Sequence, residues 1–251
     1  MFSRKRRVRA VTEYVFRSRK LSRGRALAVV ADLHDKRFDD IPGGCGEADA
    51  LLIPGDLIHR YPSGTQRGLA FIREMSSRMP VYYTFGNHED LCGEAFEEEA
   101  RAAGATVLNN RFICDGELVI GGIRLFDEPR LFKRHDLREI GDGLAGEASR
   151  MLDAMDTEDG FRLLLCHNPS HHAMMIDGRG AELTVSGHAH GGQIRLFGRG
   201  MYAPHQGLLP ALTRGVYGGG LLISAGASNA SIIPRFGNPA EILLVRLLPF
   251  E

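Results

Sequence analysis

Short apolar runs rich in branched residues recur along the chain, each bounded by Gly, Pro or Asp. Runs of this length and composition are typical of buried strands. The clearest of them predict strands at residues 26–31, 50–54, 81–85, 162–166, 183–186 and 241–247. Helical periodicity at residues 65–78, 94–103 and 144–155 separates them, with Gly104 as a stop signal after the second helix. This alternation predicts a sheet flanked by helices.

The two ends of the chain have a different character. Residues 200–238 are rich in Gly and Pro and carry few helix signals, which predicts loops and short strands. Residues 1–25 hold ten Lys or Arg against one Glu, so the rest of the chain is acidic although the net charge is zero. No internal repeat or linker divides the remainder. We therefore expect a basic arm at residues 1–24, with an edge strand at residues 13–16, and one domain at residues 25–251.

The basic arm suits contact with an anionic membrane surface or with nucleic acid, although a solvated terminal segment is the plainer interpretation. The acidic body would repel phosphate chains, so no specific nucleic acid is expected. The chain has no apolar run of about 18 residues and no apolar signal core. Its four cysteines lack zinc-site spacing and are expected to be reduced and mostly packing residues. We expect a cytoplasmic protein, or one peripheral at the inner membrane face.

Polar residues of one chemical kind stand where the strand-like runs end. These are Asp32 and His34, then Gly55 and Asp56, then Gly86, Asn87 and His88, then His167, and last Gly187, His188 and His190. The carboxyl ends of strands in a flanked sheet share one edge, where ligands bind. Any one pair alone would be accidental, but five in succession predict that these donors meet in space.

Carboxylate, amide oxygen and neutral imidazole, with no thiolate, suit a hard or borderline divalent cation. Seven such donors are too many for one ion and fit two if one carboxylate bridges them. Two metals about 3.5–4 Å apart form the clamp used for in-line displacement at phosphorus. The glycines before Asp56, Asn87 and His188 agree with this picture, because the backbone must turn sharply there.

On these residues the sequence resembles the calcineurin-like metallophosphoesterases. The motifs are Asp32-Leu33-His34, Gly55-Asp56, Gly86-Asn87-His88-Glu89, His167 and Gly187-His188-Ala189-His190. The resemblance runs over residues 25–247. A finer resemblance, to the bacterial YkuE-like subgroup, lies in residues 166–169, 187–194 and 231–242.

The resemblance implies a four-layer α/β/β/α sandwich with two divalent metal ions at the carboxyl ends of the strands. One metal would take Asp32, His34 and His190, the other would take Asn87, His167 and His188, and Asp56 would bridge them. His88 would be the catalytic residue, facing the substrate to stabilise the transition state or protonate the leaving oxygen. Manganese is the first expectation for both metals, with iron, zinc and cobalt as alternatives.

Some features remain open at this stage. Glu89 is either a carboxylate that orients a metal-binding histidine or a charge at a helix amino terminus. His59 stands where many relatives carry an acidic residue. Residues 122–132 form either a substrate-facing loop or a plain surface loop. His171, His172 and His205 are left out of the predicted site.

The implied function is hydrolysis of a phosphate mono- or diester by in-line attack of a metal-bridging hydroxide. One alternative is a membrane-surface pyrophosphatase of a nucleotide-activated glycolipid, held at the membrane by the basic arm. A nuclease is disfavoured by the acidic body. A non-catalytic scaffold with this fold is disfavoured because no metal residue is missing. The natural substrate and the oligomeric state are left open by the sequence.

Overall fold

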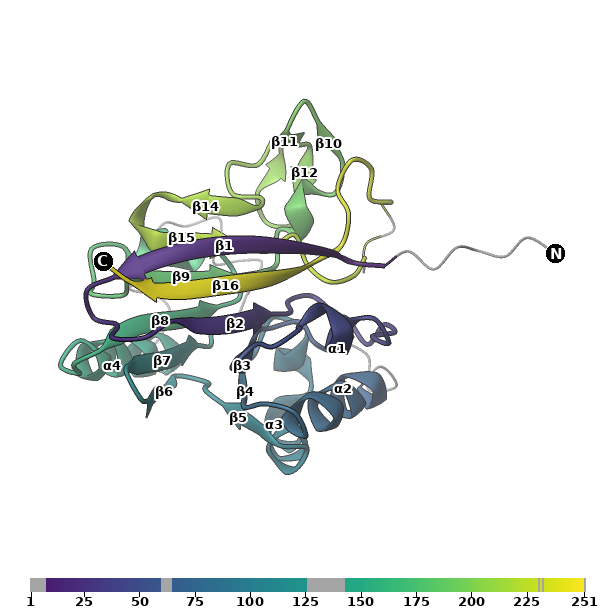
Figure 1. Ribbon diagram of the computed structural model, residues 1–251. Helices are drawn as coiled ribbons and strands as arrows, with labels where there is room; N and C mark the ends of the chain where they lie inside the picture. Colours follow the sequence, from purple (N-terminus) through teal and green to yellow (C-terminus); the bar gives the residue numbers. More distant parts are fainter. Residues whose placement is uncertain (1–7, 60–64, 126–142, 230, 232, 251) are drawn as a thin grey trace.

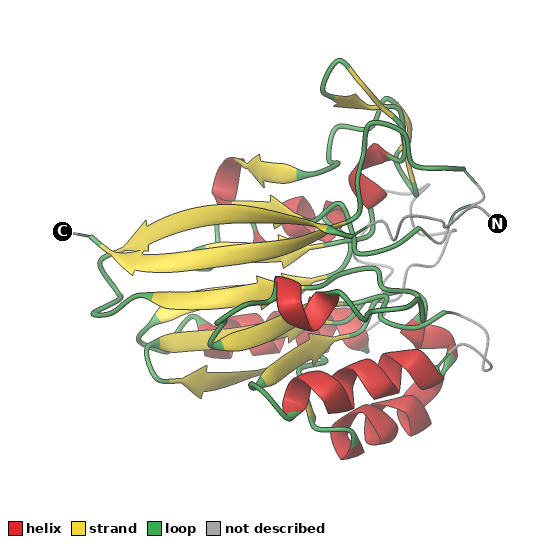
Figure 2. Ribbon diagram, turned by 45° about the vertical axis from the view of Figure 1, so that its right-hand side comes forward, coloured by secondary structure: helices red, strands yellow, loops and turns green. Residues whose placement is uncertain are grey.

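Two six-stranded sheets face each other, and helices pack on their outer faces (Figures 1 and 2). The structure, a computed structural model, describes residues 8–59, 65–125, 143–229, 231 and 233–250. The arrangement is the α/β/β/α sandwich that the family resemblance implied.

The first sheet contains the amino-terminal strands and the last strand of the chain. Its order is β1 (Ala10–Ser18), β16 (Glu241–Pro249), β2 (Arg25–Val29), β3 (Ala50–Pro54), β4 (Val81–Thr84) and β5 (Ala105–Val107). Strands β2 to β5 run parallel to one another, β16 is antiparallel to β2, and β1 runs parallel to β16.

The second sheet is built mainly from the middle of the chain. Its order is β14 (Gly215–Tyr217), β15 (Leu221–Ile223), β9 (Leu183–Ser186), β8 (Phe161–Cys166), β7 (Leu118–Ile123) and β6 (Arg111–Asp115). The four inner strands are parallel, and an antiparallel strand closes each edge. Parallel inner strands in both sheets bring two sets of carboxyl ends to the same end of the molecule.

The strands are apolar on both faces because each sheet lies between two layers. Leu27 and Val29 of β2 belong to the core between the sheets, whereas Ala28 and Val30 belong to the core under the helices. Side chains alternate between the faces of a strand, so a strand covered on both sides reads as a continuous apolar run. This explains why the sequence pattern predicted these strands.

Helices α1 (Ile41–Gly44), α2 (Gln66–Ser76) and α3 (Gly93–Ala102) lie on the first sheet's side, and α4 (Leu144–Met155) lies against the second sheet. The boundaries predicted for α4 are those observed, and the predicted ends of α2 and α3 differ by one or two residues. Differences of this size are ordinary at helix ends. The four cysteines are unpaired, as expected.

Strand β1 contains residues 13–16 and pairs along its length with β16. Its side chains alternate, and Val11 and Val15 are about half exposed. Residues 10–18 therefore belong to the first sheet, while residues 1–7 lie outside the described part of the chain. The domain boundary after residue 24 stays a prediction.

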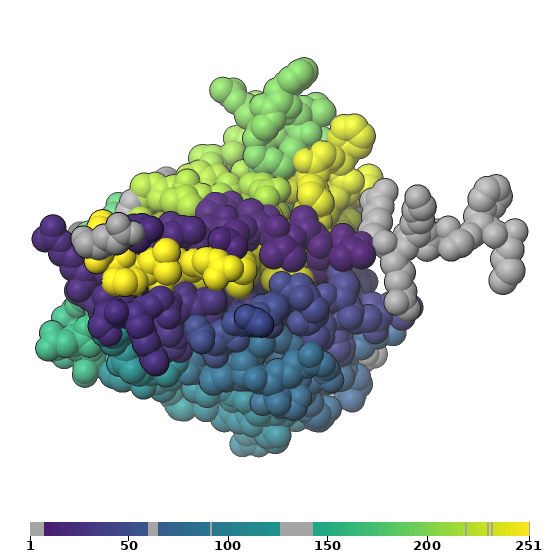
Figure 3. Space-filling model, viewed as in Figure 1, coloured from purple at the N-terminus to yellow at the C-terminus, as the bar shows by residue number. Residues whose placement is uncertain are grey.

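The carboxyl third consists of loops and short strands where it is described, as predicted for residues 200–238. Residues 195–209, called the flap here, overlap the start of this segment and form two small hairpins. These are β10 (Arg195–Leu196) with β11 (Arg199–Gly200), and β12 (Tyr202–Ala203) with β13 (Gly207–Leu208). The flap stands out from the body of the molecule, as the green lobe at the top of Figure 3 shows.

Residues 122–132 begin within β7, which contains Gly122 and Ile123, and the part from residue 126 onward lies outside the described residues. Among the residues that the structure describes, no helix has the length and apolar character needed to cross a membrane.

Candidate metal centre

The polar side chains at the strand ends meet in one buried region where the two sheets adjoin. Asp32 and His34 follow β2, Asp56 follows β3, Asn87 and His88 follow β4, His167 follows β8, and His188 and His190 follow β9. The structure therefore brings the eight predicted site residues together, although they span residues 32 to 190 of the chain.

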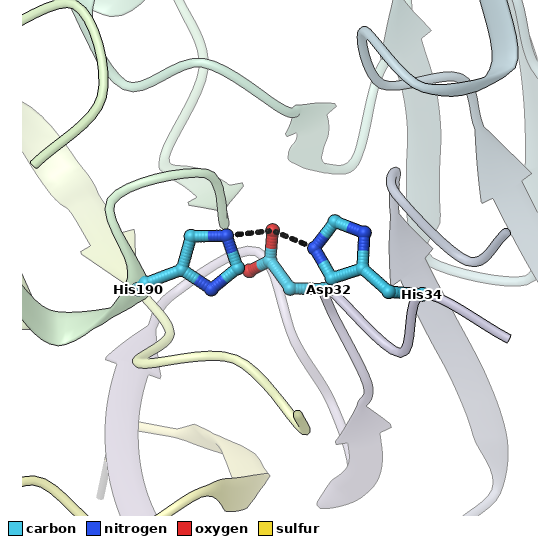
Figure 4. A group of neighbouring side chains, drawn as sticks. All are labelled: Asp32, His34 and His190. Carbon is cyan, nitrogen blue, oxygen red and sulfur yellow. Dashed lines mark ion pairs between the residues drawn. The ribbon is translucent and has the colours of Figure 1, made fainter. Parts of the chain in front are cut away.

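A first cluster is formed by Asp32, His34 and His190 (Figure 4). Oδ1 of Asp32 lies between the two imidazoles, 3.9 Å from Nε2 of His34 and 3.9 Å from Nε2 of His190. Oδ2 of Asp56 lies 3.8 Å from the same nitrogen of His34. Ligand atoms that each lie about 2.0–2.2 Å from one cation are separated by distances of this order.

His34 supports the presence of a cation in this cluster. Both of its ring nitrogens are buried, and neither has a hydrogen-bond partner in the described part of the chain. Burial, which penalises the charged form, holds the pKa of His34 well below its usual value despite the nearby Asp56 carboxylate. A buried imidazole without partners is costly, and a metal ion would satisfy it.

A second cluster contains Asp56, His167 and His188, with Asn87 beside them. Oδ1 of Asn87 lies 3.0 Å from Nδ1 of His188 and 3.1 Å from Nε2 of His167. Oδ2 of Asp56 lies 3.3 Å from Nε2 of His167. Asp56 thus contacts both clusters, as a bridging carboxylate would.

The tautomer of His167 is set by its neighbour on the far side. Its Nδ1 lies 2.8 Å from the carbonyl oxygen of Pro54, which only accepts, so Nδ1 donates the hydrogen bond. Nε2 is then the atom that faces Asp56 and Asn87. Burial lowers the pKa of His167, but the Asp56 carboxylate outweighs it and raises that pKa to about 10. Nε2 is therefore a position where a divalent cation would compete with a proton.

His88 lies at the edge of this arrangement. Its Nε2 is 3.8 Å from Oδ2 of Asp56, and its ring packs edge-on against that of His34 at 4.5 Å between centroids. His34, Asp56 and His88 also form a set whose ligand atoms could hold a cation. Because geometry alone allows both roles, the assignment of His88 as catalytic and not metal-binding stays a prediction. The ring of His59, the residue that departs from the family pattern, packs against the ring of His88 with 5.4 Å between centroids.

The backbone at the centre is strained. Five of the predicted ligands have left-handed φ values, namely Asp32 (54°), His34 (50°), Asp56 (51°), His188 (65°) and His190 (46°). Each such residue costs about 1–3 kcal/mol and persists only where surrounding contacts enforce it. The loops are tied to each other, since the N–H groups of Asp32 and His34 donate to the carbonyl oxygens of Gly55 and Asp56. This concentration of strain is typical of a functional site.

The glycines that precede the ligands are required by close packing. A Cβ on Gly55, whose φ is +87°, would lie 2.7 Å from the backbone of Gly86 and 2.7 Å from Nδ1 of His167. A Cβ on Gly187 would lie 2.7 Å from Oδ2 of Asp32. A Cβ on Gly86 would lie 2.7 Å from the backbone nitrogen of Asp56, so the sequence-based expectation that these glycines allow close approach at the site is confirmed for all three.

Glu89 lies in the first turn of the short 3-10 helix η2 (Glu89–Leu91), which is one of the two positions considered from sequence, and its carboxylate also has a further role. Its buried carboxylate accepts hydrogen bonds from the N–H groups of Gly86 at 2.7 Å, Asp56 at 2.9 Å and Ile58 at 3.1 Å. Burial and the adjacent Asp56 carboxylate raise the pKa of Glu89 to about 8. Glu89 therefore holds together the backbone of the loops after β3 and β4, from which Asp56, Asn87 and His88 project.

Two further residues at the centre were missed by sequence reasoning. Nδ1 of His205, from the flap, lies 2.8 Å from Nε2 of His188, the ring nitrogen that faces away from Asn87. A guanidinium nitrogen of Arg235 lies 3.4 Å from Nδ1 of His190. The signal for Arg235 was present in the unusual motif at residues 231–242, to which no role was given. No sequence signal identified His205.

The same motif supports the loop of His190. The side-chain amide of Asn238 donates to the carbonyl oxygens of His190 at 2.7 Å and Gln193 at 3.1 Å. His171 lines a small pocket with Asn87 and His167. His172 contacts Thr184, with 3.1 Å between Nδ1 and Oγ1.

The sequence model of the family described as Calcineurin-like phosphoesterase matches residues 26–192. The chain is 34% identical over 227 residues to a Bacillus subtilis protein named YpbG, covering 87% of this chain and 79% of that protein. It is 29% identical over 216 residues to a Helicobacter pylori protein described as a metallophosphoesterase, covering 81% of this chain and 52% of that protein. The chain spans about half the length of the Helicobacter and Campylobacter relatives that it matches. These matches leave the YkuE-like subgroup a prediction.

Among solved structures, the chain matches the sulfate thiohydrolase SoxB of Thermus thermophilus with TM-score 0.43 and 18% identity, covering 79% of this chain and 38% of that chain. A purple acid phosphatase from yellow lupin matches with TM-score 0.40 and 12% identity, covering 69% of this chain and 39% of that chain.

Proposed function

The chain belongs to the calcineurin-like phosphoesterase family, and from this premise we propose that it hydrolyses a phosphate mono- or diester at a centre of two divalent cations. The observation that carries the proposal is the convergence of carboxylate, amide and imidazole donors into two buried clusters that share Asp56. The unpartnered imidazole of His34 supports it independently.

In this proposal each cluster would hold one cation. Asp32, His34 and His190 would hold the first, Asn87, His167 and His188 would hold the second, and Asp56 would contribute to both. Bound there, two divalent cations would supply Lewis-acid polarisation of a phosphoryl group and activation of water near neutral pH. Manganese is the first candidate, with iron, zinc and cobalt as alternatives, because hard and borderline donors accept all four.

His88 has the position expected of a proton donor to the leaving group. Its side chain is 10% exposed, whereas that of His34 is fully buried, so His88 lies nearer to the surface from which a substrate would arrive. A positioned acid contributes about 10²–10⁴ in rate.

Arg235 is the proposed contact for a phosphate oxygen of the substrate. Its Nε and Nη1 are buried without a hydrogen-bond partner in the described part of the chain, while Nη2 donates to the carbonyl oxygen of Ser228 at 2.5 Å. Burial lowers the pKa of Arg235 to about 10, so the side chain is a cation at neutral pH. A cationic fork with free donors beside a metal ligand suits a phosphate oxygen.

The experiment that tests the proposal combines elemental analysis with a panel of chromogenic phosphate monoesters and diesters, with and without added Mn²⁺. We expect about two equivalents of metal and turnover of at least one ester class. Metal-loaded protein that is inactive on monoesters, diesters and pyrophosphates alike would favour the non-catalytic scaffold instead.

A further inference from the structure

The flap carries large apolar side chains in full contact with solvent. Phe197 is 104% exposed and Leu208 is 81% exposed, the highest values among the large apolar residues of the described chain. Leu209 and Phe236 are also exposed, and the backbone of Phe236 pairs with that of Ile194 at the base of the flap. Scattered exposed apolar residues are ordinary, but a group on one projecting element marks an interaction surface.

The backbone at the flap tip indicates that Phe197 is there for its side chain. Leu196 pairs with Arg199, so Phe197 and Gly198 form the two-residue turn between β10 and β11, with φ values of +50° and +80°. Turns with two positive φ values favour Asn-Gly, and a bulky residue at the first position is strained. Leu209, at the end of the second hairpin, also has a positive φ of 52°. Two strained positions thus present large apolar side chains to solvent.

The charge of this region is one-sided. Between Glu182 and Glu241 the chain contains four arginines and no lysine or acidic residue, in contrast to the acidic body. Arg195, Arg199 and Arg214 line a cavity of about 360 Å³ at the flap, together with Leu209 and Tyr217. Glu241 pairs with Arg214, at 2.5 Å between Arg214 Nη2 and Glu241 Oε2. The side chain of Arg195 donates only to carbonyl and hydroxyl oxygens, and the side chain of Arg199 makes no hydrogen bond or ion pair with the described residues. Two cationic groups there lack a carboxylate partner.

We propose that the flap is a membrane-docking element that inserts Phe197 and Leu208 into an anionic phospholipid bilayer and receives lipid phosphate at Arg195 and Arg199. Binding at a bilayer interface requires aromatic and leucine side chains that enter the apolar layer and basic side chains beside them that contact anionic headgroups. The flap also carries His205, whose Nδ1 lies 2.8 Å from Nε2 of His188. Docking therefore brings the metal centre near the headgroup layer. This inference is independent of the proposed hydrolysis.

Vesicle sedimentation with the full chain tests the proposal. We expect binding to phosphatidylcholine vesicles that contain phosphatidylglycerol, weaker binding as salt is added, and little binding to phosphatidylcholine alone. The double variant Phe197→Ser, Leu208→Ser should bind roughly tenfold more weakly or worse, because two apolar anchors are lost. Arg199→Gln should weaken binding about fivefold.

Matched controls are available elsewhere on the surface. Met174→Ser with Phe250→Ser removes two exposed apolar residues that lie outside both the flap and the basic arm, and Arg73→Gln removes an exposed cation from α2. Both should bind vesicles like the parent chain. If the flap double variant does not fold, as judged by its thermal midpoint, the test is the comparison of vesicle binding between Arg199→Gln and Arg73→Gln. Only Arg199→Gln should bind more weakly than the parent chain. The proposal is overturned if the flap variants and the controls bind anionic vesicles equally well. That result would indicate that the basic arm, and not the flap, binds the membrane. It is also overturned if the flap double variant changes only the oligomeric state.

Discussion

At the residue scale, the imidazoles of the centre differ in what surrounds them. His34 has no hydrogen-bond partner within the described chain, and His167 directs Nε2 inward because Nδ1 donates to Pro54. Both environments suit a metal ligand. His88 lies at the same 3.8 Å from Asp56 as His34, but its side chain is 10% exposed whereas that of His34 is fully buried, which suits a group that exchanges a proton with the substrate.

Replacing His88 with Ala should lower kcat by about 10²–10⁴ and leave the metal content nearly unchanged. The reason is that a proton donor is removed while each cluster keeps its other donors. Steady-state kinetics and elemental analysis on the same preparation measure both quantities. Loss of about one equivalent of metal together with activity would make His88 a ligand.

Replacing Arg235 with Lys should lower kcat/KM by about 100-fold, because Lys keeps the charge but loses the planar fork that faces a phosphate oxygen. Metal content should not change. Arg246→Lys is the matched control, since Arg246 is a half-exposed residue of β16 that pairs with Glu13 at 2.9 Å. If Arg235→Lys loses metal instead, the residue acts by supporting His190.

At the element scale, the strand ends are packed against one another through glycine. Gly55→Ala should destabilise the metal-free protein by about 2–5 kcal/mol, because the left-handed φ disfavours a side chain and the new Cβ meets Gly86 and His167. Urea denaturation measures the free energy of unfolding. Gly43→Ala in α1 is the control. A Cβ on Gly43 would meet nothing within 4 Å, so the stability of this variant should not fall. Equal stability of both variants would show that the loops relax freely.

Sequence reasoning missed β7 and the flap strands for two different reasons. Strand β7 contains Gly121 and Gly122, which weaken the strand signal, yet a Cβ on Gly121 would lie 2.9 Å from side-chain atoms of Leu164 and Met155. Gly is present because β8 and α4 pack closely there. The flap strands have two residues each, too short for any periodic pattern.

At the scale of the whole molecule, the centre joins the two sheets, because its donors follow strands of both. Asp32 follows β2 of the first sheet and accepts hydrogen bonds from the N–H of His188, which follows β9 of the second, at 3.1 and 3.2 Å. Cations bound to donors from both sheets would stabilise the sandwich against unfolding.

Adding Mn²⁺ at about 100 times its Kd should stabilise the protein by about 2.7 kcal/mol, a rise in Tm of about 5–10 °C. Thermal denaturation with Mn²⁺ and with a chelator measures the shift. Asp56→Asn should remove most of this Mn²⁺-dependent rise in Tm, because Asp56 contacts both clusters. An undiminished shift in Asp56→Asn would place the binding site elsewhere.

The sequence by itself determined the main strands, the helices and the eight polar residues of the centre. Those follow from local signals, since a strand buried on both faces is continuously apolar and the residue after it lies at the shared edge of the sheet. Only the tertiary structure showed which groups Glu89, His205 and Arg235 contact at the centre, and that the flap carries exposed Phe197. Glu89 bonds to Asp56, Gly86 and Ile58, and Arg235 reaches His190 from 45 residues away. Such contacts depend on how loops pack in three dimensions, and no periodicity along the chain encodes them.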